Sequence, residues 1–222
     1  MVAITATTPL DLAGLSPSGF TLDGQYTQYR IYSSVTTPTG FTFSSSQGNG
    51  SFALYRSYFQ NNAAGTTTTN VDSGASLSLS AASAFYNQAA GAMTTNVETS
   101  ASLSLSGSSS FFQNSASGTM TTNVETSASL SLSSGSRFDN AAAGNMTTNV
   151  ETSASLSLSA ASAFWNRASG TMTTNVETSA NLSLSDGSHF VNAAAGNMTT
   201  NVETSASLSL SGYSFFYNRA TG

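Results

Sequence analysis

The segment Thr94–Ser106 reads TTNVETSASLSLS, and this phrase recurs along the chain. Copies stand at Thr121–Ser133, Thr147–Ser159, Thr173–Ser185 and Thr199–Ser211, and a looser copy, TTNVDSGASLSLS, stands at Thr68–Ser80. The asparagine of TTNV recurs at steps of 26, 27, 26, 26 and 26 residues. A near-constant period of this length predicts units of supersecondary structure that stack on one another.

A second phrase, Phe-x-Asn-x-Ala-x-Gly, lies between most copies, as at Phe85–Gly91. From Phe85 onward, every other residue is apolar, small or an amide, and most residues between them are polar. This alternation is typical of strands that bury one face. The predicted inward set of this repeat is Phe85, Asn87, Ala89, Gly91, Met93, Thr95, Val97, Thr99, Ala101, Leu103 and Leu105. A step of 26 is even, so each position keeps its face in the next repeat.

These patterns predict an all-β fold, a β-solenoid of about six 26-residue coils with about three short strands in each. Successive coils are expected to stack at about 4.8 Å, which lines up identical residues in ladders. The extra residue between Leu105 and Phe112 is expected to form a bulge at a corner. The rival interpretation is an antiparallel meander or sandwich with two strands per repeat.

The start of the chain lacks the repeat and holds all three prolines, Pro9, Pro17 and Pro38. A solenoid needs an end unit that hides its open edge from other chains. We therefore divide the chain into an irregular N-terminal cap or assembly segment, residues 1–50, and the solenoid repeats, residues 51–222.

One asparagine per repeat falls in the inward set. These residues are Asn61, Asn87, Asn114, Asn140, Asn166, Asn192 and Asn218. A buried amide without partners costs a few kcal/mol. We expect a structural asparagine ladder in which each side chain donates to the next.

All five glutamates occupy a single repeat position: Glu98, Glu125, Glu151, Glu177 and Glu203. Stacked carboxylates repel one another, by roughly 1 kcal/mol per neighbour in water. The row is expected to be exposed to solvent, to bind calcium as a metal ladder, or to contact a partner. Calcium takes six to eight oxygen ligands, of which Glu98 with Asn96 and Ser100 supplies only some. Apart from calcium, no cofactor is expected.

Composition excludes several classes of protein. Only 7% of residues are charged, the net charge is −5 and there is no cysteine. This balance gives no basic surface for nucleic acid and no thiolate metal site. We expect no transmembrane segment, because no apolar run approaches 18 residues, and the N-terminus lacks the pattern of a secretory signal peptide.

The sequence does not predict an enzyme. His189 is the only histidine, and other repeats place alanine or arginine at its position, so we interpret it as a surface variant. Without a second histidine or a cysteine, a Ser-His-Asp triad or a zinc site lacks its usual parts.

The phrase Asn-x-Ala, the alternating small residues and the period in the twenties resemble curlin-type fibre subunits over residues 59–222. Those proteins build bacterial extracellular fibres from stacked strand-turn-strand repeats with amide ladders. Their flanking glutamine and serine ladder is not matched, and the present period is longer. The resemblance implies self-assembly outside the cell, for example in a biofilm matrix.

The leading hypothesis is therefore a structural subunit that self-assembles into an extracellular fibre by end-to-end strand stacking. The sequence as given stops inside a repeat, at Gly222, so we expect an open last coil that the N-terminal segment of a neighbour completes. Expected partners are other copies of the chain and a surface or matrix polysaccharide. The expected location is extracellular or at the cell surface, by a route without a recognisable signal peptide.

Two other functions stay open. The first is a rigid stalk or adhesin of a cell surface or phage fibre. The second is ice binding, because outward serines such as Ser102 and Ser104 form rows of hydroxyls. Ice-binding solenoids typically present Thr-x-Thr in place of serine. The simpler interpretation of the serine rows is a solvated surface or a face for lateral packing between solenoids.

Overall fold

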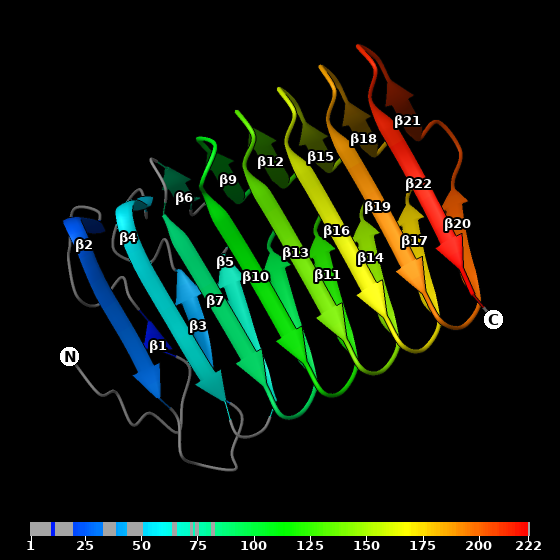
Figure 1. Ribbon diagram of the computed structural model, residues 1–222. Helices are drawn as coiled ribbons and strands as arrows, with labels where there is room; N and C mark the ends of the chain where they lie inside the picture. Colours follow the sequence, from blue (N-terminus) through cyan, green and yellow to red (C-terminus); the bar gives the residue numbers. More distant parts are fainter. Residues whose placement is uncertain are drawn as a thin grey trace.

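The computed structural model describes residues 10–11, 20–32, 39–43, 51–63, 66–71, 73, 76–80 and 83–221, with side chains for those from residue 66 on except Thr67. Every element of regular structure in these ranges is a β-strand, and Figure 1 shows equivalent strands of successive coils lying side by side. The predicted all-β solenoid is confirmed.

Each coil has three faces, which we name by their outward residues. The serine face contains β6 (Ser76–Ser80), β9 (Ser102–Ser106), β12 (Ser129–Ser133), β15 (Ser155–Leu158), β18 (Asn181–Leu184) and β21 (Ser207–Leu210). The variable face contains β7 (Ala84–Ala89), β10 (Phe111–Ala116), β13 (Arg137–Ala142), β16 (Ala163–Ala168), β19 (His189–Ala194) and β22 (Phe215–Ala220). The threonine/asparagine face contains β5 (Thr67–Val71), β8 (Met93–Val97), β11 (Met120–Val124), β14 (Met146–Val150), β17 (Met172–Val176) and β20 (Met198–Val202).

All pairs between the described strands are parallel, and each strand pairs with its equivalent one coil away. Leu103 lies opposite Leu130, and Val97 lies opposite Val124. The variable and serine faces join through the long strand β4 (Ser51–Ala63), which pairs with both β6 and β7. Parallel pairing at this register excludes the antiparallel meander.

The core consists of columns of identical side chains. Phe85, Phe112, Phe138, Phe164 and Phe190 are fully buried. Their rings, continued by Phe216, stack with centroids 4.7–5.0 Å apart and planes within 8° of parallel. Columns of leucine and valine fill the same core, and methionine and alanine form a second cluster. Stacked coils therefore bury side chains that no single coil could cover.

The corner after the threonine/asparagine face corrects one prediction. Thr99 was expected to face inward, but it is exposed. The strand ends at Val97, and the turn closes with a hydrogen bond of 2.8 Å from Ala101 N–H to the Glu98 carbonyl. Ser100 adopts φ 60°, and its equivalents adopt φ 59°, so the alternation of strands does not hold through this corner.

The extra residue between Leu105 and Phe112 lies at a corner, as expected. The turn starts at Gly107, which has φ 93°, and β10 begins at Phe111. The strands on both sides keep their register with the next coil, so the insertion stays inside the turn.

The backbone of the N-terminal strands follows the same pairing. β2 (Phe20–Tyr32) is parallel to β4, β3 (Thr39–Phe43) is parallel to β5, and β1 (Leu10–Asp11) is parallel to β3. The role of residues 1–50 as a cap or assembly segment, and the boundary at residue 50, stay predictions, because much of that segment lies outside the described residues.

Candidate functional site

The inward asparagines form a continuous chain of hydrogen bonds. Each Nδ2 donates to the Oδ1 of the next coil over 2.9–3.0 Å, from Asn87 through Asn114, Asn140, Asn166 and Asn192 to Asn218. Each also donates to an inward threonine across the core, as Asn114 does to Thr95 over 3.1 Å. Asn61 lies opposite Asn87 in backbone register, but its side chain lies outside the described set. The ladder thus gives buried amides partners that water cannot supply.

A second asparagine ladder was missed by the sequence reasoning. It runs on the outside of the threonine/asparagine face through Asn70, Asn96, Asn123, Asn149, Asn175 and Asn201, at 2.8–2.9 Å per step. Here each Nδ2 donates to the preceding coil, which is opposite to the inner ladder. The signal was present in the period of TTNV, which places these asparagines in one outward row.

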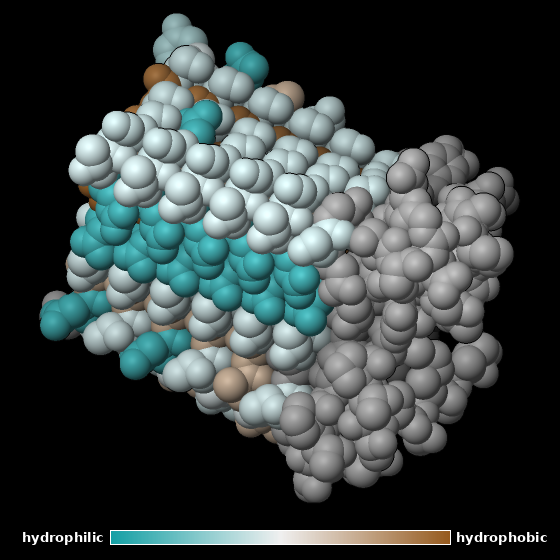
Figure 2. Space-filling model, turned by 180° about the vertical axis from the view of Figure 1, so that it is seen from behind, coloured by the Kyte–Doolittle hydropathy of each residue, from teal (hydrophilic) through white to brown (hydrophobic). Residues whose placement is uncertain are grey.

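The glutamates form one row along the corner that follows this face. The Glu98 N–H donates to the Val71 carbonyl and the Glu125 N–H to the Val97 carbonyl, each over 2.9 Å, which aligns the row from coil to coil. Figure 2 shows a continuous hydrophilic band along this side of the molecule. The side chains from Glu98 to Glu177 are half-buried, and Glu203 is exposed.

The environment of the row disfavours the charged form at its centre. Partial burial, then the charges of Glu125 and Glu177, raise the pKa of Glu151, and a hydrogen bond from the Thr126 backbone opposes the rise. The raised pKa of Glu151 agrees with the repulsion between like charges that a stacked row of carboxylates predicts.

Calcium binding by this row stays a prediction. Within the described residues, no three acidic or histidine side chains are grouped closely enough to hold a metal ion. The hypothesis predicts a higher melting temperature with added calcium, and an identical melting curve with a chelator would rule it out.

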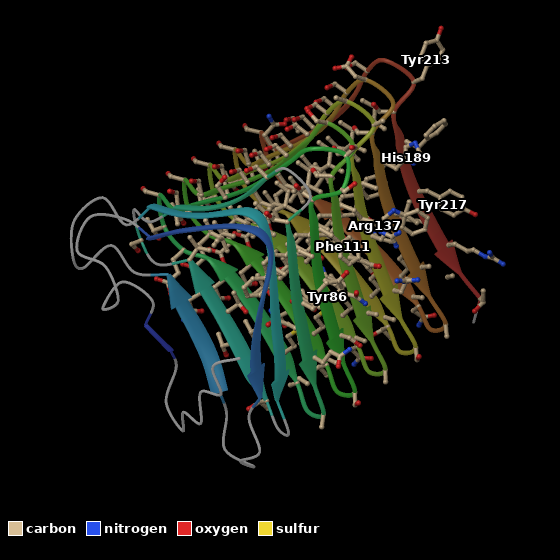
Figure 3. All side chains as sticks on the ribbon, turned by 60° about the vertical axis from the view of Figure 1, so that its left-hand side comes forward. Tyr86, Phe111, Arg137, His189, Tyr213 and Tyr217 are labelled. Atoms are coloured by element: carbon tan, nitrogen blue, oxygen red, sulfur yellow. The ribbon has the colours of Figure 1, made fainter. Side chains whose placement is uncertain are left out.

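The variable face carries the side chains that differ between repeats. Figure 3 shows Tyr86, Phe111, Arg137, His189 and Tyr217 projecting along it. All three arginines with described side chains and the only tryptophan lie here, at Arg137, Arg167, Arg219 and Trp165. The serine face and the threonine/asparagine face, in contrast, repeat nearly the same residues in every coil.

An ion cluster lies at the centre of the variable face. Asp139 is 3% exposed, and its Oδ2 accepts from Arg137 over 2.8 Å and from Arg167 over 2.7 Å. The Arg137 guanidinium also lies 5.2 Å from the Trp165 ring centroid and 5.7 Å from that of Phe111. Among the described side chains Asp139 is the one buried carboxylate, and with two guanidinium groups beside it the cluster has a formal charge of +1.

His189 lies on the variable face, half-buried, with its ring edge-on to Phe215 at a centroid distance of 5.3 Å. The hydrogen bonds and ion pairs between described side chains do not connect His189 to a serine or an acid. The interpretation of His189 as a surface variant stays a prediction.

Comparison with known protein families, with curated proteins and with solved structures gives no match for this chain. None of the described residues belongs to a helix long and apolar enough to cross a membrane. The fold itself therefore defines the class of protein: a parallel β-solenoid with two uniform faces and one variable face.

Proposed function

We propose that this chain is a structural subunit that self-assembles into an extracellular fibre by end-to-end strand stacking. The observation that supports the proposal is the coil formed by β20, β21 and β22. Its Val202 and Leu210 are 47% and 45% exposed, whereas Val176 and Leu184, one coil earlier, are 0% and 2% exposed. A further coil stacked on this one would bury the same columns again.

The free edges of β20, β21 and β22 offer backbone N–H and C=O groups that could pair with the strands of a further coil. In the described chain, each of the three strands pairs on one side only. Asn218 accepts from Asn192 and donates to Thr200, which leaves one Nδ2 hydrogen in position for the next amide. Because every coil has the same register, a second copy can continue all three ladders at once.

Negative-stain electron microscopy across a concentration series tests the proposal. We expect long unbranched filaments whose number rises with concentration. Leu210→Lys should abolish them, since the filament would bury an ammonium group without a partner, at a cost of several kcal/mol. The fold of the unassembled chain should tolerate Leu210→Lys, because the Leu210 side chain is already 45% exposed in the chain alone.

Ser209→Lys is the matched control, since it places the same charge on the outward side of the same strand. It should leave filaments intact. Short uniform rods from the unmodified chain at every concentration would overturn the fibre proposal and favour the rigid stalk or adhesin.

Ice binding is a second candidate function, favoured by the threonine/asparagine face. Each coil from β8 to β20 presents one outward threonine and one outward asparagine, in register, as Thr147 and Asn149 do. This array repeats at the coil spacing, as the serine rows do, and it presents threonine, which the serine rows lack. The test is thermal hysteresis, with Thr147→Tyr to disrupt the row and Ser157→Tyr on the serine face as control. No hysteresis in the unmodified chain would exclude this function.

A further inference from the structure

The variable face differs from the rest of the molecule in its charge. The whole chain carries −5, yet this face holds three arginines against one aspartate, a formal charge of +2 between the described side chains. The aspartate is buried and compensated. Arg219 is exposed, and the ion pairs between described side chains leave it without an acidic partner. The face can therefore attract an anion although the whole chain is acidic.

An elongated groove runs along this face. Its volume is about 720 Å³, and its lining includes Ser115, Ala141, Arg167, Ala193, Arg219 and Thr221. The first five of these residues are equivalent positions of β10, β13, β16, β19 and β22, so the groove follows the solenoid axis. Four coil steps span roughly 19 Å, which suits an extended ligand.

The two arginines of the groove lie beside an outward row that contains aromatic rings. Arg167 and Arg219 are two coils apart, roughly 10 Å, with the small side chain of Ala193 between them. The neighbouring outward row places Trp165 and Tyr217 at the same two coils, and Tyr217 is 52% exposed. Arg219, which has no ion pair with a described side chain, can bind a carboxylate in bidentate fashion, whereas Arg167 already donates to Asp139 through Nη2 and offers its remaining N–H groups. The Tyr217 ring offers an exposed apolar surface in the neighbouring row, and the Trp165 ring there already lies 5.2 Å from the Arg137 guanidinium.

We propose that this groove binds a linear acidic polysaccharide with carboxylate groups. Guanidinium groups would hold the carboxylates, and the aromatic rings would pack against the apolar faces of the sugar rings. An extended acidic peptide fits less well, because the groove lies on the face of a sheet whose backbone is already paired within the ladder, so the peptide would find no backbone partners. The inference does not depend on end-to-end assembly.

Isothermal titration calorimetry with polygalacturonate tests the proposal. The fully methyl-esterified form of the same polymer has the same backbone without the charge. We expect measurable binding of polygalacturonate and at least about tenfold weaker binding of the ester, as the loss of charge-assisted hydrogen bonds requires. Arg219→Gln should weaken binding of the acid by about tenfold, and Tyr217→Ser should also weaken it.

Ser209→Asp is the matched control, because it makes the net charge one unit more negative, as Arg219→Gln does, but on the serine face. It should leave the affinity unchanged. Equal affinity for the ester, or equal weakening by Ser209→Asp and Arg219→Gln, would overturn the proposal. Electron microscopy of the same variants shows whether filaments form, so the failure of polysaccharide binding is distinguishable from the failure of assembly.

Discussion

At the scale of the residue, asparagine appears in two different environments. Asn140 is fully buried in the inner ladder, and Asn149, in the same coil, is half-buried in the outer ladder. Both join their neighbours at 2.8–2.9 Å. The free energy that each ladder contributes differs because water can replace a lost partner only on the outside.

Asn140→Ala is therefore expected to destabilise the solenoid. It leaves the buried Nδ2 of Asn114 and the hydroxyl of Thr122 without their partner, and unpaired buried groups cost about 1–3 kcal/mol each. Asn149→Ala should cost less than about 1 kcal/mol. Chemical denaturation of both variants measures the difference. An equal loss of unfolding free energy would contradict this account of the inner ladder.

The glutamate row gives the second prediction at this scale. Because the folded state raises the pKa of Glu151, the folded chain holds this proton more tightly than the unfolded chain. The resulting stability is complete below the unfolded pKa and is lost as the pH rises through the raised folded value. The contribution of Glu151 should therefore lower the melting temperature as the pH rises above the ordinary pKa of glutamate, about 4.3.

Glu151→Gln should reduce that fall and raise the melting temperature at pH 7. Asp186→Asn removes an equal charge at a different corner and serves as the control. A lower melting temperature of Glu151→Gln at pH 7 would show that the carboxylate stabilises the row, contrary to this account.

At the scale of the element, the corner between the variable and threonine/asparagine faces depends on glycine. A Cβ added to Gly144 would lie 2.9 Å from the carbonyl oxygen of Gly118 in the preceding coil. The carbonyl itself accepts a hydrogen bond of 3.0 Å from the Gly144 N–H, so it cannot move without breaking the ladder.

Gly144→Ala should thus lower the unfolding free energy by about 1–3 kcal/mol through overpacking. Gly187→Ala is a contrasting case, since a Cβ there meets nothing within 4 Å and the cost comes from φ +73° alone. Circular dichroism melts of both variants test this. If Gly144→Ala were as stable as the unmodified chain, the corners at Gly118 and Gly144 could move apart without cost, which would contradict this account.

Strands were easier to predict than corners. Alternating leucine and serine, as at Leu103 and Ser104, allowed the sequence to predict which face each side chain occupies. Thr99 was assigned to the wrong side because strand alternation ends where Ser100 adopts a left-handed backbone. The ion cluster was not predicted, because Arg167 reaches Asp139 from the next coil. The two residues do not occupy the same position of the repeat, so the period alone does not pair them.

At the scale of the whole molecule, the three faces divide the chemistry. Two faces repeat nearly the same residues and suit regular contacts, whereas the variable face carries the three arginines whose side chains are described, together with exposed aromatic rings. The glutamates lie on a separate corner, away from these arginines. This arrangement is consistent with a rod that stacks through its coils and binds ligands along one side.

Stacking is the central claim, and electron microscopy of the unmodified chain over a concentration series tests it most directly. The account predicts long unbranched filaments that disappear with Leu210→Lys and persist with Ser209→Lys. Single short rods at all concentrations would contradict it.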